Sequence, residues 1–164
     1  ADVKGKASLE AWCVRDMTAQ MGARLKLADE HLLPVKGRGG GVCDTGGAVA
    51  VDGGIVVGTD RMNRIIEINV DDLYAICQPG LRTIEVQQAV GKHGLMFAPD
   101  PASYKDRFIG GNLAENAGGM RTPKYGVTKP HVLGLKVVTP TGEVVRTGCQ
   151  TVKHVGQFDL HGHV

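Results

Sequence analysis

Glycine is concentrated in residues 34–54, which read PVKGRGGGVCDTGGAVAVDGG. Consecutive glycines allow successive backbone N–H groups to converge on one point, and an anion can then approach without obstruction by a Cβ atom. Arg38 either adds positive charge to such a loop or is a solvated loop residue. Strand-like hydrophobic runs flank the segment closely, which disfavours a disordered linker. The segment predicts an anion-binding loop, with a tight structural turn as the alternative.

Two named nucleotide-binding motifs do not fit this loop. A Walker A loop requires Gly-Lys-Ser/Thr after its glycines, and no such triplet follows here. A GxGxxG fingerprint fails from Gly37, because its last position is Val42, and from Gly39, because its last position is Asp44. What remains is a more general nest of backbone amides.

A second cluster of small residues occupies residues 109–126, IGGNLAENAGGMRTPKYG. Its two Gly-Gly pairs predict a loop that closes with the first one on a diphosphate from both sides. The alternative is a glycine-tolerant helix that packs tightly against a sheet. Turn or cap roles for Asn112 and Asn116 compete with ligand contacts.

Cysteines and histidines do not form a recognisable reactive or metal-binding pattern. Cys13, Cys43, Cys77 and Cys149 lie far apart without a CxxC pair, so free thiols are expected. Cys43 lies in the first glycine loop, where a small filler is favoured over a nucleophile. His161 and His163 are interpreted as a frayed end rather than a metal pair. We therefore expect no catalytic residue and no metal site.

Composition excludes several classes of partner. The 164-residue chain has a net charge of +2 and 4% aromatic residues, which argues against nucleic-acid binding by electrostatics or base stacking. No apolar run approaches the length of a membrane span. A cytoplasmic protein is expected.

The elements that position these loops alternate between strands and helices. Hydrophobic runs predict strands in residues 11–15, 32–36, 48–51, 54–58, 64–70 and 73–80, and two more around a turn at Thr141-Gly142. Helical spacing predicts a helix from a Thr18 cap to about His31, and another over 83–94 with Thr83 as its cap and Gly94 as its end.

Several motifs occur in an order that resembles one known family. They are LPVKGRGGGVCDTGGA, VDGGIVVGTDRMNRI, CQPGLRTIEVQQAVGKHGLMFAPDPASY and IGGNLAENAGGMRTPKYGVTKPHVLGLKVVTPTGEVVRTG. Over roughly residues 14–160 the chain resembles the FAD-binding domain of FAD-linked oxidases, the group of p-cresol methylhydroxylase and vanillyl-alcohol oxidase. The similarity is strongest to the D subunit of glycolate oxidase and to flavin D-lactate dehydrogenases.

The resemblance implies an α+β fold, the two-subdomain FAD-binding domain of the p-cresol methylhydroxylase type, incomplete at the C-terminus. The domain would cover residues 1–164, with a small N-terminal subdomain up to about residue 58. FAD is the implied cofactor. The implied contacts come from the first loop, two proline-containing turns and the second cluster: Arg38, Gly39, Gly40, Gly41, Val42, Cys43; Pro79, Gly80, Pro99, Asp100, Pro101, Ser103; Gly110, Gly111, Asn112, Asn116, Ala117, Gly118 and Gly119.

Four residues depart from the family's pattern. Val42 stands where threonine is usual, Cys43 where glycine is usual, and Phe108 where a small hydroxyl residue is usual. Gly58 interrupts a strand that a large apolar residue normally fills.

The implied function is FAD binding within a 2-hydroxy-acid oxidoreductase of the glycolate or D-lactate type. The family places its substrate machinery beyond residue 164, so this chain alone is expected to be inactive. It would meet a 2-hydroxy-acid substrate only together with that further region, with partner redox subunits and peripheral attachment to a membrane through them as additional expectations. The alternatives are a non-catalytic FAD-binding scaffold that needs a partner chain, and a flavin-free anion-binding module.

Overall fold

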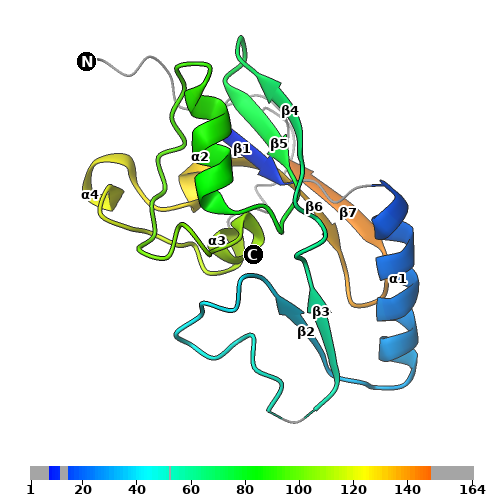
Figure 1. Cartoon of the computed structure of the whole chain (residues 1–164). Helices are drawn as coiled ribbons and strands as arrows, with labels where there is room; N and C mark the ends of the chain where they lie inside the picture. The colour runs from blue at the N-terminus through cyan, green and yellow to red at the C-terminus, as the bar shows by residue number, and fades with distance from the viewer. Residues whose placement is uncertain (1–7, 12–14, 52, 149–164) are drawn as a thin grey trace.

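The computed structural model describes residues 8–11, 15–51 and 53–148, and within these residues the strands form two sheets (Figure 1). The larger sheet has the order β4-β5-β1-β6-β7, formed by Ile65–Asn69, Tyr74–Cys77, Ser8–Ala11, Val132–Val138 and Val144–Gly148. The smaller sheet pairs β2 (Val35–Arg38) with β3 (Ile55–Gly58) in parallel. The helices are α1 (Arg15–Glu30), α2 (Thr83–Gly91), α3 (Ile109–Ala114), α4 (Thr122–Tyr125) and a 3₁₀ turn at Lys129–His131.

The larger sheet combines one central parallel strand with two antiparallel hairpins. Strand β1 runs parallel to both β5 and β6, while β4 pairs with β5 and β6 with β7 in antiparallel fashion. Between β4 and β5, the Asn69 side chain accepts a hydrogen bond from the Asp72 amide at 2.8 Å, an Asx turn. Gly142, with φ of 83°, makes the turn between β6 and β7. Both hairpins match the strands that the sequence predicts.

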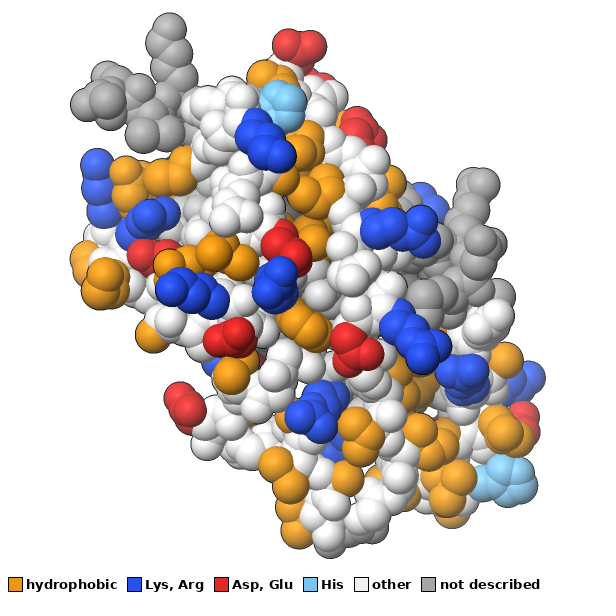
Figure 2. Space-filling view, viewed as in Figure 1, with side chains coloured by type: hydrophobic (Ala, Val, Ile, Leu, Met, Phe, Trp, Pro, Cys, Tyr) orange, Lys and Arg blue, Asp and Glu red, His pale blue; other side chains and the backbone are white. Residues whose placement is uncertain are grey.

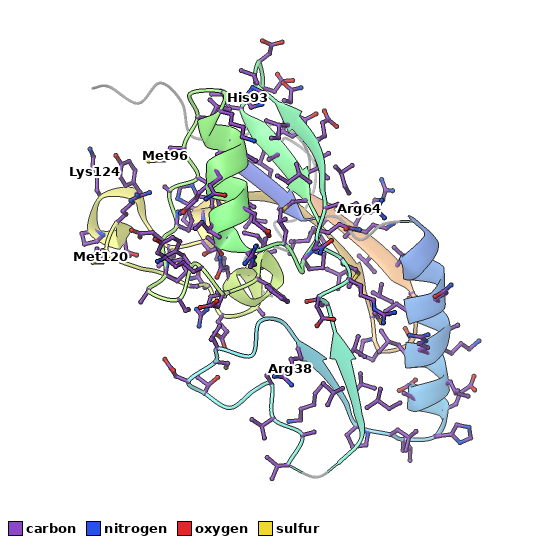
Figure 3. All side chains as sticks on the ribbon, viewed as in Figure 1. Arg38, Arg64, His93, Met96, Met120 and Lys124 are labelled. Atoms are coloured by element: carbon purple, nitrogen blue, oxygen red, sulfur yellow. The ribbon has the colours of Figure 1, made fainter. Side chains whose placement is uncertain are left out.

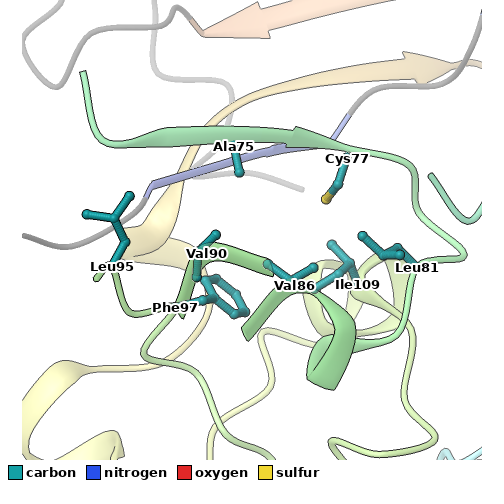
Figure 4. Packing of buried hydrophobic residues seen from close by; sticks show 8 residues of the cluster. All are labelled: Ala75, Cys77, Leu81, Val86, Val90, Leu95, Phe97 and Ile109. Atoms are coloured by element: carbon teal, nitrogen blue, oxygen red, sulfur yellow. The ribbon is translucent and has the colours of Figure 1, made fainter. Parts of the chain in front are cut away.

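The core lies between β5 and α2 (Figure 4). All four residues of β5 are buried, as expected for a strand that is paired on both sides. Val86 and Val90, one helical turn apart on α2, face Ala75 and Cys77 of that strand. Full burial of each valine contributes about 1.5–3 kcal/mol, so this contact fixes α2 on the sheet.

Helix α2 begins one residue earlier than its predicted Thr83 cap implies. Arg82, rather than Thr83, is the N-cap residue, and Thr83 is the first residue of the helix and fully buried. The Glu85 carboxylate accepts the Arg82 backbone amide at 3.0 Å and the Arg82 guanidinium at 2.7 Å. The guanidinium hydrogen bond is the main reason that the pKa of Glu85 is lowered. The helix ends at Gly91, three residues before the predicted end, and Gly94, with φ of 72°, lies in the turn that follows the helix.

Two other predicted elements are wrong near the N-terminus. The strand predicted for residues 11–15 lies instead at Ser8–Ala11; residues 12–14 are outside the described part, and α1 already begins at Arg15, before the predicted Thr18 cap. Residues 48–51 form no strand in the described structure, and Val49 and Val51 are exposed. A β-branched run becomes a strand only where a neighbouring strand pairs with it and a surface covers it.

Hydrophobic side chains are visible at the lower end of the molecule, where the β2–β3 unit lies (Figure 2). Val49, Val51, Ile55 and Val56 belong to this unit and are all exposed. The smaller sheet therefore carries little core of its own, and its glycine loop contacts the rest of the chain through both backbone and side-chain atoms.

The α+β fold class is confirmed, with two sheets of unequal size. Strand β3 ends at Gly58 and β4 begins at Ile65, on either side of the predicted subdomain boundary. Strand β1, from the first residues of the described chain, lies in the larger sheet. The division of the chain near residue 58 stays a prediction.

Candidate functional site: a glycine-lined cavity

The first glycine loop, which follows strand β2, has backbone amides that donate no hydrogen bond within the described residues. Among the hydrogen bonds formed within the described residues, none is donated by the backbone amides of Gly39, Gly40, Gly41, Val42 or Cys43. These residues are half-buried or exposed, so their N–H groups are accessible to water or to the acceptor atoms of a ligand. This is the donor arrangement that the glycine pattern predicts.

The second cluster meets this loop through α3. A Cβ atom built on Gly39 would lie 3.7 Å from the backbone nitrogen of Gly111, so the two glycine segments are in contact. A Cβ on Gly40 would overlap the carbonyl oxygen of Asp106, just before α3. Glycine is therefore required at position 40 because two backbones approach closely there. A sequence pattern alone does not distinguish this reason for a glycine from ligand access.

A cavity of about 270 Å³ lies between the loop and α3. This volume is just below the range of pockets that enclose a drug-sized ligand, and it suits a small anionic group better than a whole dinucleotide. Its walls come from both glycine segments: Gly37, Gly39, Gly40, Gly41, Val42, Cys43, Gly47 and Ala48 on one side, and Arg107, Gly111, Ala114 and Glu115 on the other. The structure thus brings together six of the sequence-predicted site residues, Gly39 to Cys43 and Gly111.

The charged residues of this lining, Arg107 and Glu115, are absent from the sequence-predicted site. Arg107 Nη2 donates to the Val42 carbonyl at 2.7 Å and lies 3.5 Å from Glu115 Oε2. The Cys43 thiol donates to Glu115 Oε1 at 2.5 Å, and the Thr45 hydroxyl donates to the same oxygen at 3.4 Å. These four side chains, which we call the clasp, join the first loop to both ends of α3. The sequence signal that could have identified Arg107 and Glu115 is the presence of a charged residue on either side of the glycine-rich IGGN segment.

Arg38, the cation expected at the loop, does not belong to this lining. It stands at the end of β2 (Figure 3), and its guanidinium lies against Gly41, where a Cβ atom would come within 3.0 Å of Arg38 Nη2. Arg38 thus supports the loop from beside it, while Arg107 reaches the cavity.

The remaining predicted contacts hold neighbouring loops together. The Gly110 amide donates to the Pro79 carbonyl at 2.8 Å, and the Gly80 amide to the Met62 carbonyl at 2.7 Å. Asp100 accepts the Arg121 amide at 2.9 Å and pairs with its guanidinium at 3.3 Å. A Cβ on Gly119 would overlap the Asp100 carbonyl oxygen. Direct cofactor contact by these residues stays a prediction.

The other predicted residues in the same region have structural partners as well. The Pro99 carbonyl accepts the Gln87 side chain at 3.0 Å, and the Ser103 carbonyl accepts the Arg107 amide at 2.8 Å. The carbonyls of Pro101 and Ala117 accept amides of Tyr104 and Thr128, Asn116 Oδ1 accepts the Lys129 amide, and Gly118 packs against Thr122. None of these belongs to the lining of the cavity described above.

Asn112 has a buried acceptor without a partner. Its amide nitrogen donates to the Thr83 hydroxyl at 2.7 Å, and that hydroxyl donates to the Arg107 carbonyl at 3.1 Å. Asn112 Oδ1 has no hydrogen-bond partner among the described residues although the side chain is fully buried. A buried orphan acceptor beneath α3 is the kind of atom that a ligand donor satisfies.

Thiols and histidines of the described chain do not build a reactive centre. Burial raises the pKa of the Cys77 thiol to about 12, so Cys77 is a core residue. His93 lies at the far end of the molecule from Arg38 (Figure 3), and His131 is buried with Nε2 2.9 Å from the Tyr125 carbonyl. Within the described residues, no group of three or more His, Cys, Asp or Glu side chains is arranged for a metal. Cys13, Cys149, His154, His161 and His163 lie outside the described residues.

None of the helices in the described part of the chain has the length and apolar character of a bilayer span.

The fold and the cavity together define a class of protein. The glycine loop that follows strand β2 of the small parallel sheet faces α3, a short glycine-containing helix, across the cavity. Unpaired amides and one arginine make that space suitable for an anionic group such as a diphosphate. This combination is typical of domains that bind an anionic cofactor.

The sequence matches the FAD binding domain family over residues 15–148, and the chain belongs to that family. FAD is thus its cofactor. The glycolate oxidase subunit GlcD of Bacillus subtilis is 42% identical over 143 residues, which cover 87% of this chain and 30% of that protein. A D-lactate dehydrogenase of Anaerostipes hadrus is 35% identical over 158 residues, covering 96% of this chain and 33% of that protein.

A solved structure supports the fold. The 6-hydroxy-D-nicotine oxidase of Arthrobacter nicotinovorans aligns with a TM-score of 0.71 and 29% identity, over 90% of this chain and 32% of that one. The chain spans about a third of the length of the relatives it matches.

Proposed function

We propose that this chain is the FAD-binding part of a flavin-dependent oxidoreductase that acts on 2-hydroxy acids, and that the cavity between the two glycine clusters holds the diphosphate of FAD. The observation that carries the proposal is the run of unpaired amides from Gly39 to Cys43 facing Gly111 in a cavity with an arginine. The two relatives named for glycolate and D-lactate support the choice of substrate class.

The residues present fit the cofactor. Amides of the first loop would donate to phosphate oxygens, and Arg107 would add the positive charge that a diphosphate requires. FAD, when bound, supplies the redox chemistry, while these residues bind and orient it.

Flavin fluorescence provides the test. The chain should quench the fluorescence of added FAD, and Gly39→Ala should weaken binding at least about fivefold, because a methyl group would then stand between the two glycine segments. Gly39 has no neighbour closer than 3.7 Å to its built Cβ, so the variant should fold. Gly91→Ala is the matched control, since Gly91 lies in α2 with open space around it and outside the cavity lining. Equal affinities of the two variants, or no quenching at high FAD concentration, would contradict the proposal.

A further inference from the structure

The cavity contains a carboxylate where an anionic ligand is expected. Glu115, the C-cap residue of α3, belongs to the lining, and its side chain is anchored to the first loop by the Cys43 thiol. A negative charge beside a diphosphate opposes binding, because like charges repel more strongly at a partly buried site than in water. Glu115 is 34% exposed and Arg107 15% exposed, so both charges are partly removed from solvent.

Arg107 is held unequally by its two partners. Its short contact is with the Val42 carbonyl at 2.7 Å, and its longer one is with Glu115 at 3.5 Å. A partly exposed ion pair at the longer distance contributes little stability, typically below about 1 kcal/mol. Arg107 can therefore keep its hydrogen bond to the Val42 carbonyl while its guanidinium pairs with another anion in place of Glu115.

We propose that the Glu115 carboxylate competes with the diphosphate of FAD for the guanidinium of Arg107. Without ligand, Glu115 neutralises Arg107 and, through Cys43, holds the first loop against α3. When FAD binds, its phosphates pair with Arg107 in place of Glu115. Glu115 then loses its contact with the first loop and turns toward solvent. The clasp thus sets the affinity and the selectivity for the phosphorylated cofactor. This inference rests on the proposed function, because it takes the anion to be the cofactor's diphosphate.

The test compares ligands with and without phosphate in the full chain. Glu115→Gln should bind FAD about five- to tenfold more tightly than the unaltered chain, since one opposing charge is removed at close range. Its affinity for riboflavin, which carries the same ring without phosphate, should stay within about twofold. Arg107→Gln should weaken FAD binding about tenfold. Glu143→Gln, which removes an exposed carboxylate in the turn between β6 and β7, is the control and should change neither affinity.

Inorganic pyrophosphate gives a second measurement that does not depend on flavin. It should raise the Tm of Glu115→Gln more than the Tm of the unaltered chain. The inference is overturned if Glu115→Gln binds FAD equally or more weakly, if FAD and riboflavin affinities shift together, or if pyrophosphate stabilises both proteins to the same extent. Failure of the proposed function looks different: the unaltered chain and every variant would bind neither FAD nor riboflavin, and the pyrophosphate comparison would still decide the role of Glu115.

Discussion

At the scale of single residues, two cysteines with the same chemistry have different environments. Cys77 lies in the centre of the core on β5, whereas Cys43 is half-buried in the glycine loop and donates to Glu115. Burial raises the pKa of Cys77 from 9.0 to about 12 because the thiolate would lose its hydration. The folded chain therefore holds the Cys77 proton more tightly than the unfolded chain does.

This difference makes stability depend on pH. The folded-state pKa of Cys77 is raised, so its contribution is complete below pH 9 and is lost as the pH rises toward 12. Denaturant unfolding under reducing conditions should show Cys77→Ala less stable at pH 8 by about 1–2 kcal/mol, because a buried atom is removed. At pH 10 the difference should shrink by about 1.4 kcal/mol, the worth of one pH unit. A difference that is independent of pH would show that the buried thiol is not the titrating group.

The glycine positions of the site could be predicted from the sequence, whereas its charges could not. A run of glycines exposes the backbone in any fold, so Gly39 to Gly41 and Gly111 could be identified as candidate site residues from the sequence. Arg107 and Glu115 flank α3, which was predicted only as the alternative to a loop. Their shared position on one cavity depends on how that short helix packs, and no spacing rule encodes it. Arg38 was expected to supply charge because it is adjacent in sequence, but Arg107 reaches the lining from another segment.

At the scale of elements, strands and helices were predictable where a local pattern and a tertiary partner agree. The runs at 65–69, 74–77 and 132–148 became strands because each has a paired neighbour. The equally β-prone residues 48–51 have no strand partner in the described structure and remain irregular. Helix α3 is difficult to predict from the sequence because its two glycines lower the intrinsic helix propensity. Backbone hydrogen bonds to the carbonyls of Leu81 and Pro79 hold its first residues instead.

The approach of the first loop to the segment before α3 gives a prediction about stability. Gly40→Ala should destabilise the ligand-free chain by about 1–3 kcal/mol, because its Cβ would overlap the Asp106 carbonyl and force the two backbones apart. Gly37→Ala, three residues earlier with open space around the built Cβ, should change stability by less than about 0.5 kcal/mol. Thermal unfolding of both variants measures the difference. If they match, Gly40 is there for ligand access alone.

At the scale of the whole molecule, the cavity is the place where the glycine loop of the smaller sheet meets α3. Its lining comes from the loop after β2 and from α3, whereas α1 contributes no residue to it. Saturating FAD should therefore slow amide hydrogen exchange in residues 39–48 and 109–115 and leave residues 20–30 of α1 unchanged apart from global stabilisation, which reaches about 2.7 kcal/mol at 100-fold excess over Kd. Protection confined to one of the two glycine segments would argue against a shared site.

The substrate question also belongs to the whole molecule. We expect glycolate and D-lactate to leave FAD bound to this chain oxidised under anaerobic conditions, because the histidines of the described part, His31, His93 and His131, lie outside the lining of the cavity. A general base acts only within hydrogen-bond reach of the proton it removes. The absorbance of the bound flavin reports the outcome. Bleaching by glycolate, or by D-lactate but not by L-lactate, would place an active site within this chain.

The position of β1 has a consequence for how the chain acquires its structure. This strand, at residues 8–11, lies between β5 at 74–77 and β6 at 132–138, and it is the strand that joins the two hairpins into one sheet. Each hairpin can close locally within microseconds, but their union waits for contacts that span more than half of the sequence. During synthesis β1 can pair with β5 as soon as β5 is available, but its other edge remains unpaired until β6 has left the ribosome. Completion of the larger sheet is then limited by the segment that is synthesised last, and the exposed edge of β1 is the surface most open to misassociation in that interval.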